Sequence, residues 1–333
     1  METQQTRSIL TVALMAAFAD GAKDEREREA IRRLAETLGA DSGVDLPGLY
    51  REVLLAKPSL EAVVAPLTSP ELRQFSYEMA VAVANADGSQ GPAEAEFLGR
   101  LADALGLQSG AAAATASAAA AVADAAIDPA PVTAAATASA AAAAAAATAT
   151  PVSGPVLGKA NISDAEMNKV ILNASVTNAA LELLPETIAS MAIIPLQMRL
   201  VYRIGQAYGY PMDRTHAKDF IATLGVGLTG QYLEQFGRKL LGGVFGKIGG
   251  GIGGMVGRQA ASSGMTFATT YAIGRVAQRY FAGGRTLSAD ALKQTFTSLL
   301  AEARGIAPQY QTQIEQAART IDTRNLVSLV RQG

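Results

Sequence analysis

The chain has 333 residues, of which 17% are charged, and its mean hydropathy is +0.18. It contains no Cys and a single His, His216, so disulfides, thiolate metal sites and His-rich metal sites are excluded. The composition therefore favours a binding or scaffolding protein over an enzyme built on the common catalytic constellations.

The net charge of −2 conceals an uneven distribution along the chain. Residues 1–107 carry 17 acidic and 10 basic residues, residues 108–158 carry two acidic residues, and residues 159–333 carry 11 acidic and 18 basic residues. The C-terminal part, with a balance of +7, is suited to an anionic lipid surface or an acidic protein. Its basic residues are scattered among Gly and aliphatic residues, so we expect no nucleic-acid binding.

The N-terminal 107 residues contain an internal duplication with an offset of 67 residues. Ala19-Asp20-Gly21 aligns with Ala86-Asp87-Gly88, and Glu27 aligns with Glu94. Each unit reads as a helix, an Asp-Gly turn and a second helix, and helix starts are also predicted around Pro47, Ser59 and Ser69-Pro70. The apolar run at 9–19 recurs at 76–86, so it belongs to the fold, and we expect a cytoplasmic protein.

The repeated pattern A-D-G-x5-E, followed by a helix that ends in L-x-x-x-L-G, resembles the TerB-like family of tellurite-resistance domains. The resemblance covers residues 5–107. It implies an all-helical domain linked to stress response, with acidic residues around the Asp-Gly turns as a cation site. In this chain those residues are Asp20, Glu27, Asp87 and Glu94.

Two interpretations of these acidic residues stay open. Several carboxylate oxygens brought together by two related turns can hold a hard divalent cation such as Ca²⁺ or Mg²⁺. The residues Ala16 and Val83 occupy ligand positions of an EF-hand loop and cannot ligate, so an EF-hand is excluded. The other interpretation is helix capping, because a Glu at the third helical position stabilises a helix start.

Residues 108–160 are expected to be a low-complexity linker. Of the 40 residues at 111–150, 26 are Ala, with Thr, Ser and Pro between them. Polyalanine has high helix propensity, but this segment shows no amphipathic face. We therefore expect a mobile, partly helical tether between two domains that need not touch.

Residues 161–333 are expected to form an apolar helical domain. Ser163-Asp164 starts a long apolar pattern through 181–202, a second helix is expected at 215–245, and a third ends near Phe281. Amphipathic helices are expected at 288–304 and 309–331. The Gly-rich segment 246–257 lacks a preceding strand, so it favours close helix packing in a hairpin over a dinucleotide site.

The segments I-P-L-Q-M-R-L-V-Y-R-I-G-Q-A-Y-G at 194–209 and T-T-Y-A-I-G-R-V-A-Q-R-Y-F at 269–281 resemble the YcjF-like domain of unknown function 697. The resemblance implies membrane association and a GTPase partner acting in trans, because several relatives accompany or are fused to GTPase domains. It supplies no catalytic residues. Charged residues within 215–281, among them Glu234, Arg238, Lys239, Lys247 and Arg258, favour contact with one lipid face over a free-standing span. An ordinary buried core is the alternative.

Together these features predict an all-α, non-enzymatic adaptor at the inner membrane, with a protein partner and the N-terminal domain displayed on the tether. The alternative is a soluble, metal-responsive protein of the tellurite-resistance type that oligomerises through its C-terminal domain. His216 is predicted to be a surface residue at a helix start and not a catalytic base.

Overall fold

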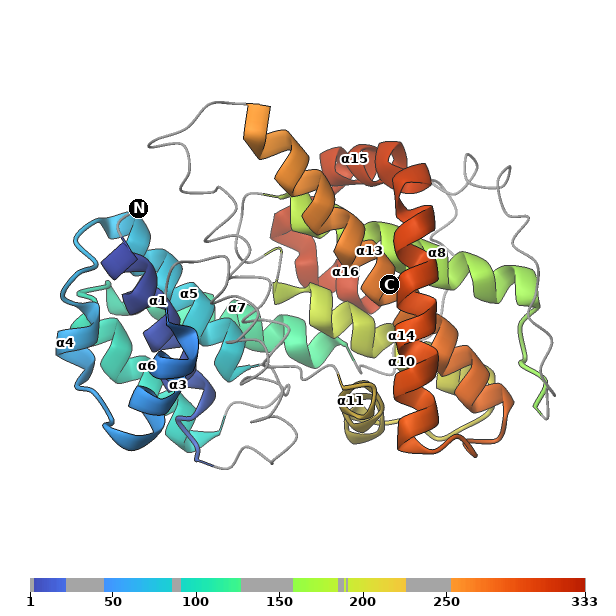
Figure 1. Cartoon of the computed structure of the whole chain (residues 1–333), viewed down its shortest axis with the longest axis horizontal. Helices are drawn as coiled ribbons and strands as arrows, with labels where there is room; N and C mark the ends of the chain where they lie inside the picture. Colours follow the sequence, from blue (N-terminus) through green and yellow to red (C-terminus); the bar gives the residue numbers. More distant parts are fainter. Residues whose placement is uncertain are drawn as a thin grey trace.

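The computed structural model describes residues 3–21, 45–85, 91–126, 158–184, 189, 191–225 and 253–332. Within these ranges every regular element is a helix (Figure 1). The predicted all-α fold class is confirmed. No helix in the described part of the chain is both long enough and apolar enough to cross a lipid bilayer.

The N-terminal half is a bundle in which α1 and α5 form the centre. Its helices are α1 (Thr3–Ala17), α3 (Leu46–Leu55), α4 (Leu60–Val64), α5 (Pro70–Ala84) and α6 (Pro92–Ala104). Helix α1 packs against α5, α3 and α4, and α6 packs against α5 and α4. Ten of the fifteen residues of α5 are buried, so this helix supplies much of the apolar core.

The helix starts in this half agree with the sequence signals. Ser59 and Ser69 are the N-caps of α4 and α5, and each hydroxyl accepts a hydrogen bond from a backbone N–H in the first turn. Pro92 opens α6, and Gly106, at φ +65°, follows its end. That backbone conformation favours glycine, which explains the Leu-Gly ending of the second repeat unit. The corresponding helix of the first unit lies outside the described residues.

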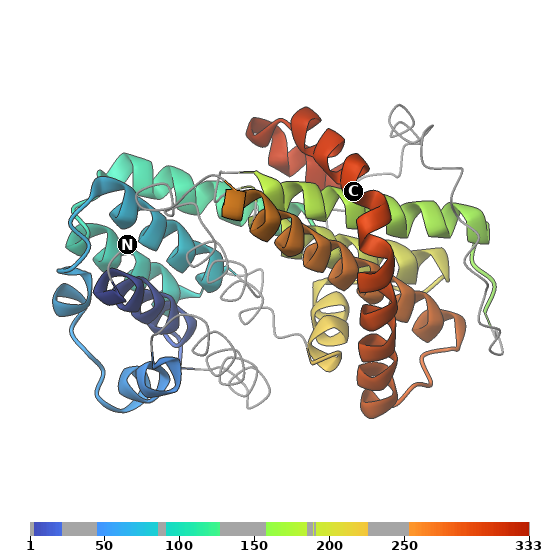
Figure 2. The ribbon, with the colours of Figure 1, turned by 45° about the horizontal axis from the view of Figure 1, so that its top comes forward.

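The C-terminal half is built around the 30-residue helix α13 (Gly253–Ala282). This helix packs against α8 (Asp164–Leu183), α10 (Ile193–Ala207) and α14 (Ala289–Ile306) (Figure 2). The remaining elements are α11 (Arg214–Thr223), η3 (Ala307–Tyr310), α15 (Gln311–Thr320), η4 (Thr323–Asn325) and α16 (Leu326–Gln332). Helix α8 begins with a capping box in which Ser163 N donates to Glu166 Oε2 at 2.9 Å, as the sequence predicted for this start.

Three helix boundaries differ from the sequence expectation. The apolar pattern through 181–202 is interrupted, because α8 ends at Leu183 and Leu184 adopts an extended conformation before Pro185. A proline disfavours the helical conformation of the residue that precedes it, so Pro185 accounts for the break at Leu184. Helix α11 ends at Thr223 and is followed by a turn at Leu224 and Gly225. Residues 226–245 of the expected helix lie outside the described residues, as does most of the 246–257 segment. The tail expected at 309–331 is divided into η3, α15, η4 and α16.

The largest difference concerns the expected linker. Residues 109–125 form helix α7 (Ser109–Ala125), which contacts α5 and α6 of the N-terminal half and α10 and α16 of the C-terminal half. Ala112, Ala119 and Val122 are buried in these contacts. A helix of small side chains has no distinct apolar stripe, so the sequence did not show that both of its sides can pack. The linker expectation fails over this stretch, and the two halves touch through α7.

Candidate functional site

The structure locates two of the four predicted cation ligands. Asp20 lies in the turn after α1 and is exposed, whereas Glu94 lies in the first turn of α6 and is only 2% exposed. Glu27 and Asp87 lie outside the described residues. No group of three or more His, Asp or Glu residues in the described ranges is placed to share a metal ion.

The Glu94 carboxylate closes a capping box at the start of α6. Its Oε2 accepts a hydrogen bond of 2.7 Å from the backbone N–H of Gly91. This is the capping interpretation that the sequence left open, and the structure shows it directly. A capping carboxylate also stabilises the positive end of the helix dipole.

A second buried side-chain oxygen lies at the end of α5, a few residues before this helix start. Asn85 ends α5, where its Nδ2 donates to Val81 O at 2.8 Å. Its Oδ1 is buried and has no hydrogen-bond partner within the described ranges. Residues 86–90, between Asn85 and Gly91, are outside those ranges. In the sequence, Asn85 and Glu94 therefore lie before and after Asp87-Gly88.

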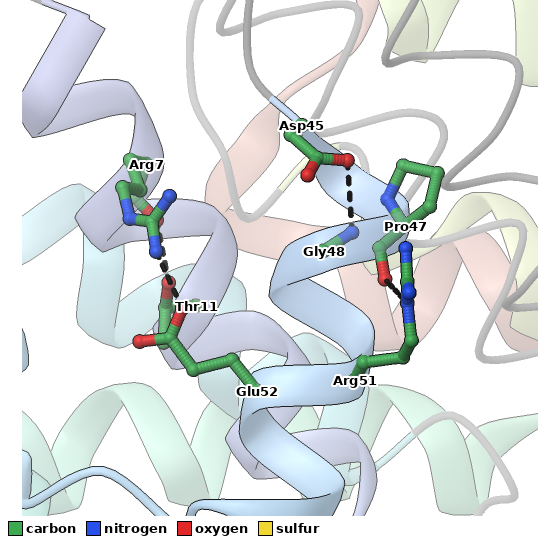
Figure 3. A network of polar contacts seen from close by, with 7 residues as sticks. All are labelled: Arg7, Thr11, Asp45, Pro47, Gly48, Arg51 and Glu52. Atoms are coloured by element: carbon green, nitrogen blue, oxygen red, sulfur yellow. Dashed lines mark hydrogen bonds and ion pairs between the residues drawn. The ribbon is translucent and has the colours of Figure 1, made fainter.

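One ion pair joins α3 to α1, and hydrogen bonds within α1 and at the start of α3 lie close to it (Figure 3). Arg7 on α1 pairs with Glu52 on α3, and Thr11 donates from its hydroxyl to Arg7 O at 2.8 Å. At the start of α3, Asp45 Oδ1 accepts from Gly48 N at 2.9 Å. Both partners of the Arg7–Glu52 pair are partly exposed, so the pair serves to position the two helices and adds little stability.

Helix α7 is held by hydrogen bonds from each half of the molecule. Near its start, Tyr77 on α5 donates from its hydroxyl to Ala112 O at 3.3 Å. Near its end, Arg214 at the start of α11 donates to Ala123 O at 2.8 Å and pairs with Asp124 at 2.9 Å. Burial raises the pKa of the Tyr77 phenol. An arginine on the last carbonyls of a helix also balances the negative end of the helix dipole.

Helix α10, against which α7 packs, is hydrogen-bonded to another helix of the C-terminal half. Arg199 on α10 is 3% exposed and donates to Arg331 O, in α16, at 3.0 Å. Arg203 follows one turn later, and its pKa is lowered, first by burial and then by the charge of Arg199. The Arg199 contact connects α10 to α16, and α7 packs against both of these helices.

The single histidine has a local structural role. His216 is 43% exposed in the first turn of α11, where its backbone N–H donates to Asp213 Oδ1 at 2.8 Å. Its Nδ1 also lies 2.8 Å from that oxygen. The hydrogen bond from the backbone of His216 lowers the pKa of Asp213. The prediction of a surface residue at a helix start is confirmed.

The centre of the C-terminal half contains a buried polar contact among three helices. Asn178 on α8 and Gln197 on α10 each donate a side-chain N–H to Thr270 Oγ1 on α13, at 3.2 and 3.1 Å. All three residues are at most 1% exposed. Side-chain amides and hydroxyls are costly to bury, so this contact calls for a functional or structural explanation.

Comparison with known families gives one informative match. Residues 1–119 match the family described as Protein of unknown function (DUF533). The match ends inside α7, so it includes most of the helix that the sequence assigned to the linker. No curated protein and no solved structure matched the chain. Nothing in these comparisons supports the YcjF-like resemblance of the C-terminal half, which stays a prediction.

Sequence reasoning missed the residues that join the two halves and those buried in the C-terminal core. Arg214 and Asp124 are 90 positions apart, and no local pattern links them. The buried polar residues carried a weak signal. Asn178 and Glu182, and likewise Thr266 and Thr270, are spaced by four within otherwise apolar helix faces. Polar residues at that spacing on a buried face indicate a polar layer.

Proposed function

We propose that the protein is a non-enzymatic adaptor that associates with an anionic membrane surface through its C-terminal half and binds a protein partner through its N-terminal half. The observation that carries the proposal is helix α7, which Tyr77 holds from one half and Arg214 from the other. An adaptor needs two binding modules in one chain, and α7 keeps them in a fixed relation. This arrangement replaces the freely displayed N-terminal domain expected from the sequence.

The stress-response context rests on family likeness. The TerB-like resemblance of residues 5–107 and the family match over residues 1–119 concern the same half of the chain. We place the protein in the cytoplasm at the inner membrane, where a TerB-like module would connect a stress response to the membrane surface. The YcjF-like resemblance supports a GTPase as the partner in trans.

Charge supports the membrane part of the proposal. Residues 159–333 carry 18 basic and 11 acidic residues. Exposed basic side chains include Arg279 near the end of α13, Arg285 in the following turn and Lys293 near the start of α14. Arg285 also lies over the ring of Tyr210, 5.8 Å from its centroid. Each basic residue near an anionic membrane contributes about 1 kcal/mol of attraction.

The test is flotation of the full chain with vesicles of anionic or of neutral lipid. We expect the protein to float with anionic vesicles only. The double variant Arg279→Gln/Lys293→Gln should float less, and the control Lys57→Gln/Arg100→Gln, which removes the same charge from the N-terminal half, should float like the wild type. Release by high salt indicates a surface contact, and resistance to a carbonate wash indicates insertion. Failure to float with any vesicle would refute membrane association.

A second candidate function is binding of Ca²⁺ or Mg²⁺ at the acidic turns. The buried, unpartnered Asn85 Oδ1 and the buried Glu94 carboxylate, which lie before and after Asp87-Gly88 in the sequence, favour it, since both are ligand types that hard cations prefer. Either cation should then raise the melting temperature, and Glu94→Gln, which preserves the cap, should abolish the increase. An unchanged increase in Glu94→Gln would leave capping as the role of this residue.

A further inference from the structure

The turn that joins α13 to α14 holds Arg285 in an uncommon backbone conformation. Helix α13 ends in a Schellman motif, in which Gly284 N donates to Phe281 O at 3.1 Å. The second bond of the motif runs from Arg285 N to Tyr280 O at 2.9 Å. The motif needs a left-handed residue only at Gly284, where φ is +71°. Arg285 is also left-handed, at φ +63°, which costs free energy in a residue with a side chain and which the helix end does not require.

The side chain of Arg285 is held over an aromatic ring. Its guanidinium carbon lies 5.8 Å from the centroid of Tyr210. Tyr210 is itself fixed, because its hydroxyl donates to Phe281 O at 3.3 Å and the two rings lie 5.4 Å apart. Arg285 is exposed and makes no ion pair with a carboxylate of the described residues. An exposed arginine whose side chain is already ordered loses less freedom when it binds an anion.

Three chain segments meet at this end of the C-terminal half. Before α8, Gly158 N donates to Ala282 O at 2.8 Å, at the end of α13. Three residues later, Asn161 N donates to Ala207 O at 2.7 Å, at the end of α10. We define the tyrosine end as Lys159, Tyr208, Tyr210, Tyr280 and Arg285. Its three tyrosines are half-buried and its two basic residues are exposed.

The carboxylates near the tyrosine end lie at helix starts. Asp213 accepts a hydrogen bond from the backbone N–H of His216 at the start of α11. Asp164 and Asp290 lie in the first turns of α8 and α14. The positive end of a helix dipole partly balances a carboxylate in this position. These three side chains therefore oppose an approaching anion less than free carboxylates would.

We propose that the tyrosine end is the face through which the C-terminal half docks on an anionic phospholipid membrane, with Arg285 bound to a lipid phosphate. Tyrosine rings favour the headgroup level of a bilayer, because one end of the side chain is apolar and the other is polar. The planar guanidinium matches the oxygens of a phosphate group. This inference rests on the membrane association proposed above and adds to it the docking face and the contact residue.

The first experiment measures the partition of the full chain onto vesicles of phosphatidylglycerol and phosphatidylcholine. Arg285→Gly removes the side chain and suits the left-handed backbone, so we expect little change in the melting temperature. The partition coefficient should fall about fivefold, the effect of one basic residue at an anionic surface. The matched control is Lys57→Gly, which removes one exposed positive charge from the N-terminal half, also at a positive φ, of +45°. It should bind like the wild type.

The outcomes separate this inference from the membrane association on which it rests. A wild type that binds no vesicle would refute both. Wild-type binding that Arg285→Gly leaves unchanged would overturn the docking face and leave membrane association intact. An equal loss of binding in Arg285→Gly and Lys57→Gly would show that net charge decides, which also overturns the docking face.

A fluorescent label tests the orientation with Arg285 in place. The chain contains no Cys, so Thr286→Cys creates a single labelling site next to Arg285. The matched site is Gln309→Cys, in η3, which packs beside Gly264, about 27 Å from Ala282 along α13. An environment-sensitive dye should shift to the blue on vesicle binding at position 286 only. Equal shifts at both positions, or a shift at position 309 alone, would overturn the proposal.

Discussion

Arg214 and Asp124, 90 positions apart, form an ion pair of 2.9 Å that joins the start of α11 to the end of α7. The Asp124 side chain is 75% exposed, so the pair itself contributes little to stability. The second bond of Arg214, to Ala123 O, is part-buried and caps the helix. The guanidinium therefore acts mainly through the backbone of α7.

The first prediction separates these two contacts. Arg214→Ala removes both, and Asp124→Asn removes only the charge pairing. We expect Arg214→Ala to destabilise the docked end of α7 by about 1 kcal/mol and Asp124→Asn by a few tenths. Hydrogen exchange of the α7 amides measures the difference. Equal exchange rates in the two variants would show that the ion pair, and not the carbonyl contact, holds the helix.

The second prediction concerns the other end of α7. Tyr77→Phe removes the hydrogen bond to Ala112 O and should cost about 1 kcal/mol near neutral pH. Burial raises the pKa of Tyr77 in the folded state, so folding favours the neutral phenol. That contribution is present below the phenol's ordinary pKa of 10.0 and is lost as the pH rises through the raised value. Urea unfolding at alkaline pH should therefore show a smaller loss of stability in Tyr77→Phe than in the wild type.

The third prediction compares two glycines of α13. A Cβ at Gly274 would lie 2.9 Å from Ile171 Cγ2 and 3.1 Å from Leu200 Cδ2, so Gly274→Ala should destabilise by about 1–3 kcal/mol. A Cβ at Gly264 meets only Ala307 Cβ, at 3.9 Å. Gly264→Ala should therefore stabilise the helix by about 0.5–1 kcal/mol. Denaturant unfolding of both variants is the measurement, and a stabilised Gly274→Ala would contradict the close packing of α8 and α10 on α13.

The fourth prediction uses the helix-capping carboxylates Glu166 and Asp213. Hydrogen bonds from the backbone of Ser163 and of His216, respectively, lower their pKa values below the ordinary 4.5 and 3.8. A lowered folded-state pKa gives stability that is present above the ordinary value and is lost as the pH falls through the lowered one. The melting temperature should thus fall on acidification below about pH 4.5, and less steeply in Glu166→Gln and Asp213→Asn. An identical acid slope in the variants would show that other groups dominate.

The helix starts were predictable because their signals are local. Ser69, Pro92 and Ser163 each act on backbone groups within one turn, and the structure places each where the sequence did. The break after Leu183 was also readable from Pro185, although the apolar pattern on both sides concealed it.

The candidate sites were less predictable because they depend on contacts between distant helices. Glu94 was singled out from its spacing after the Asp-Gly turn, and the structure gives it the capping contact. Nothing local in Thr270 shows that Asn178 and Gln197 converge on its hydroxyl. The docking of α7 could not be predicted for a different reason. A run of alanines has no amphipathic pattern, so the sequence does not show which side of the helix packs.

The shared position of α7 has a consequence for folding. Its buried residues contribute to an apolar core that is continuous between the two halves. Melting of either half would expose one side of α7 and remove packing partners from the other half. The two halves are therefore thermodynamically linked, and a destabilising substitution in one half should also lower the stability of the other.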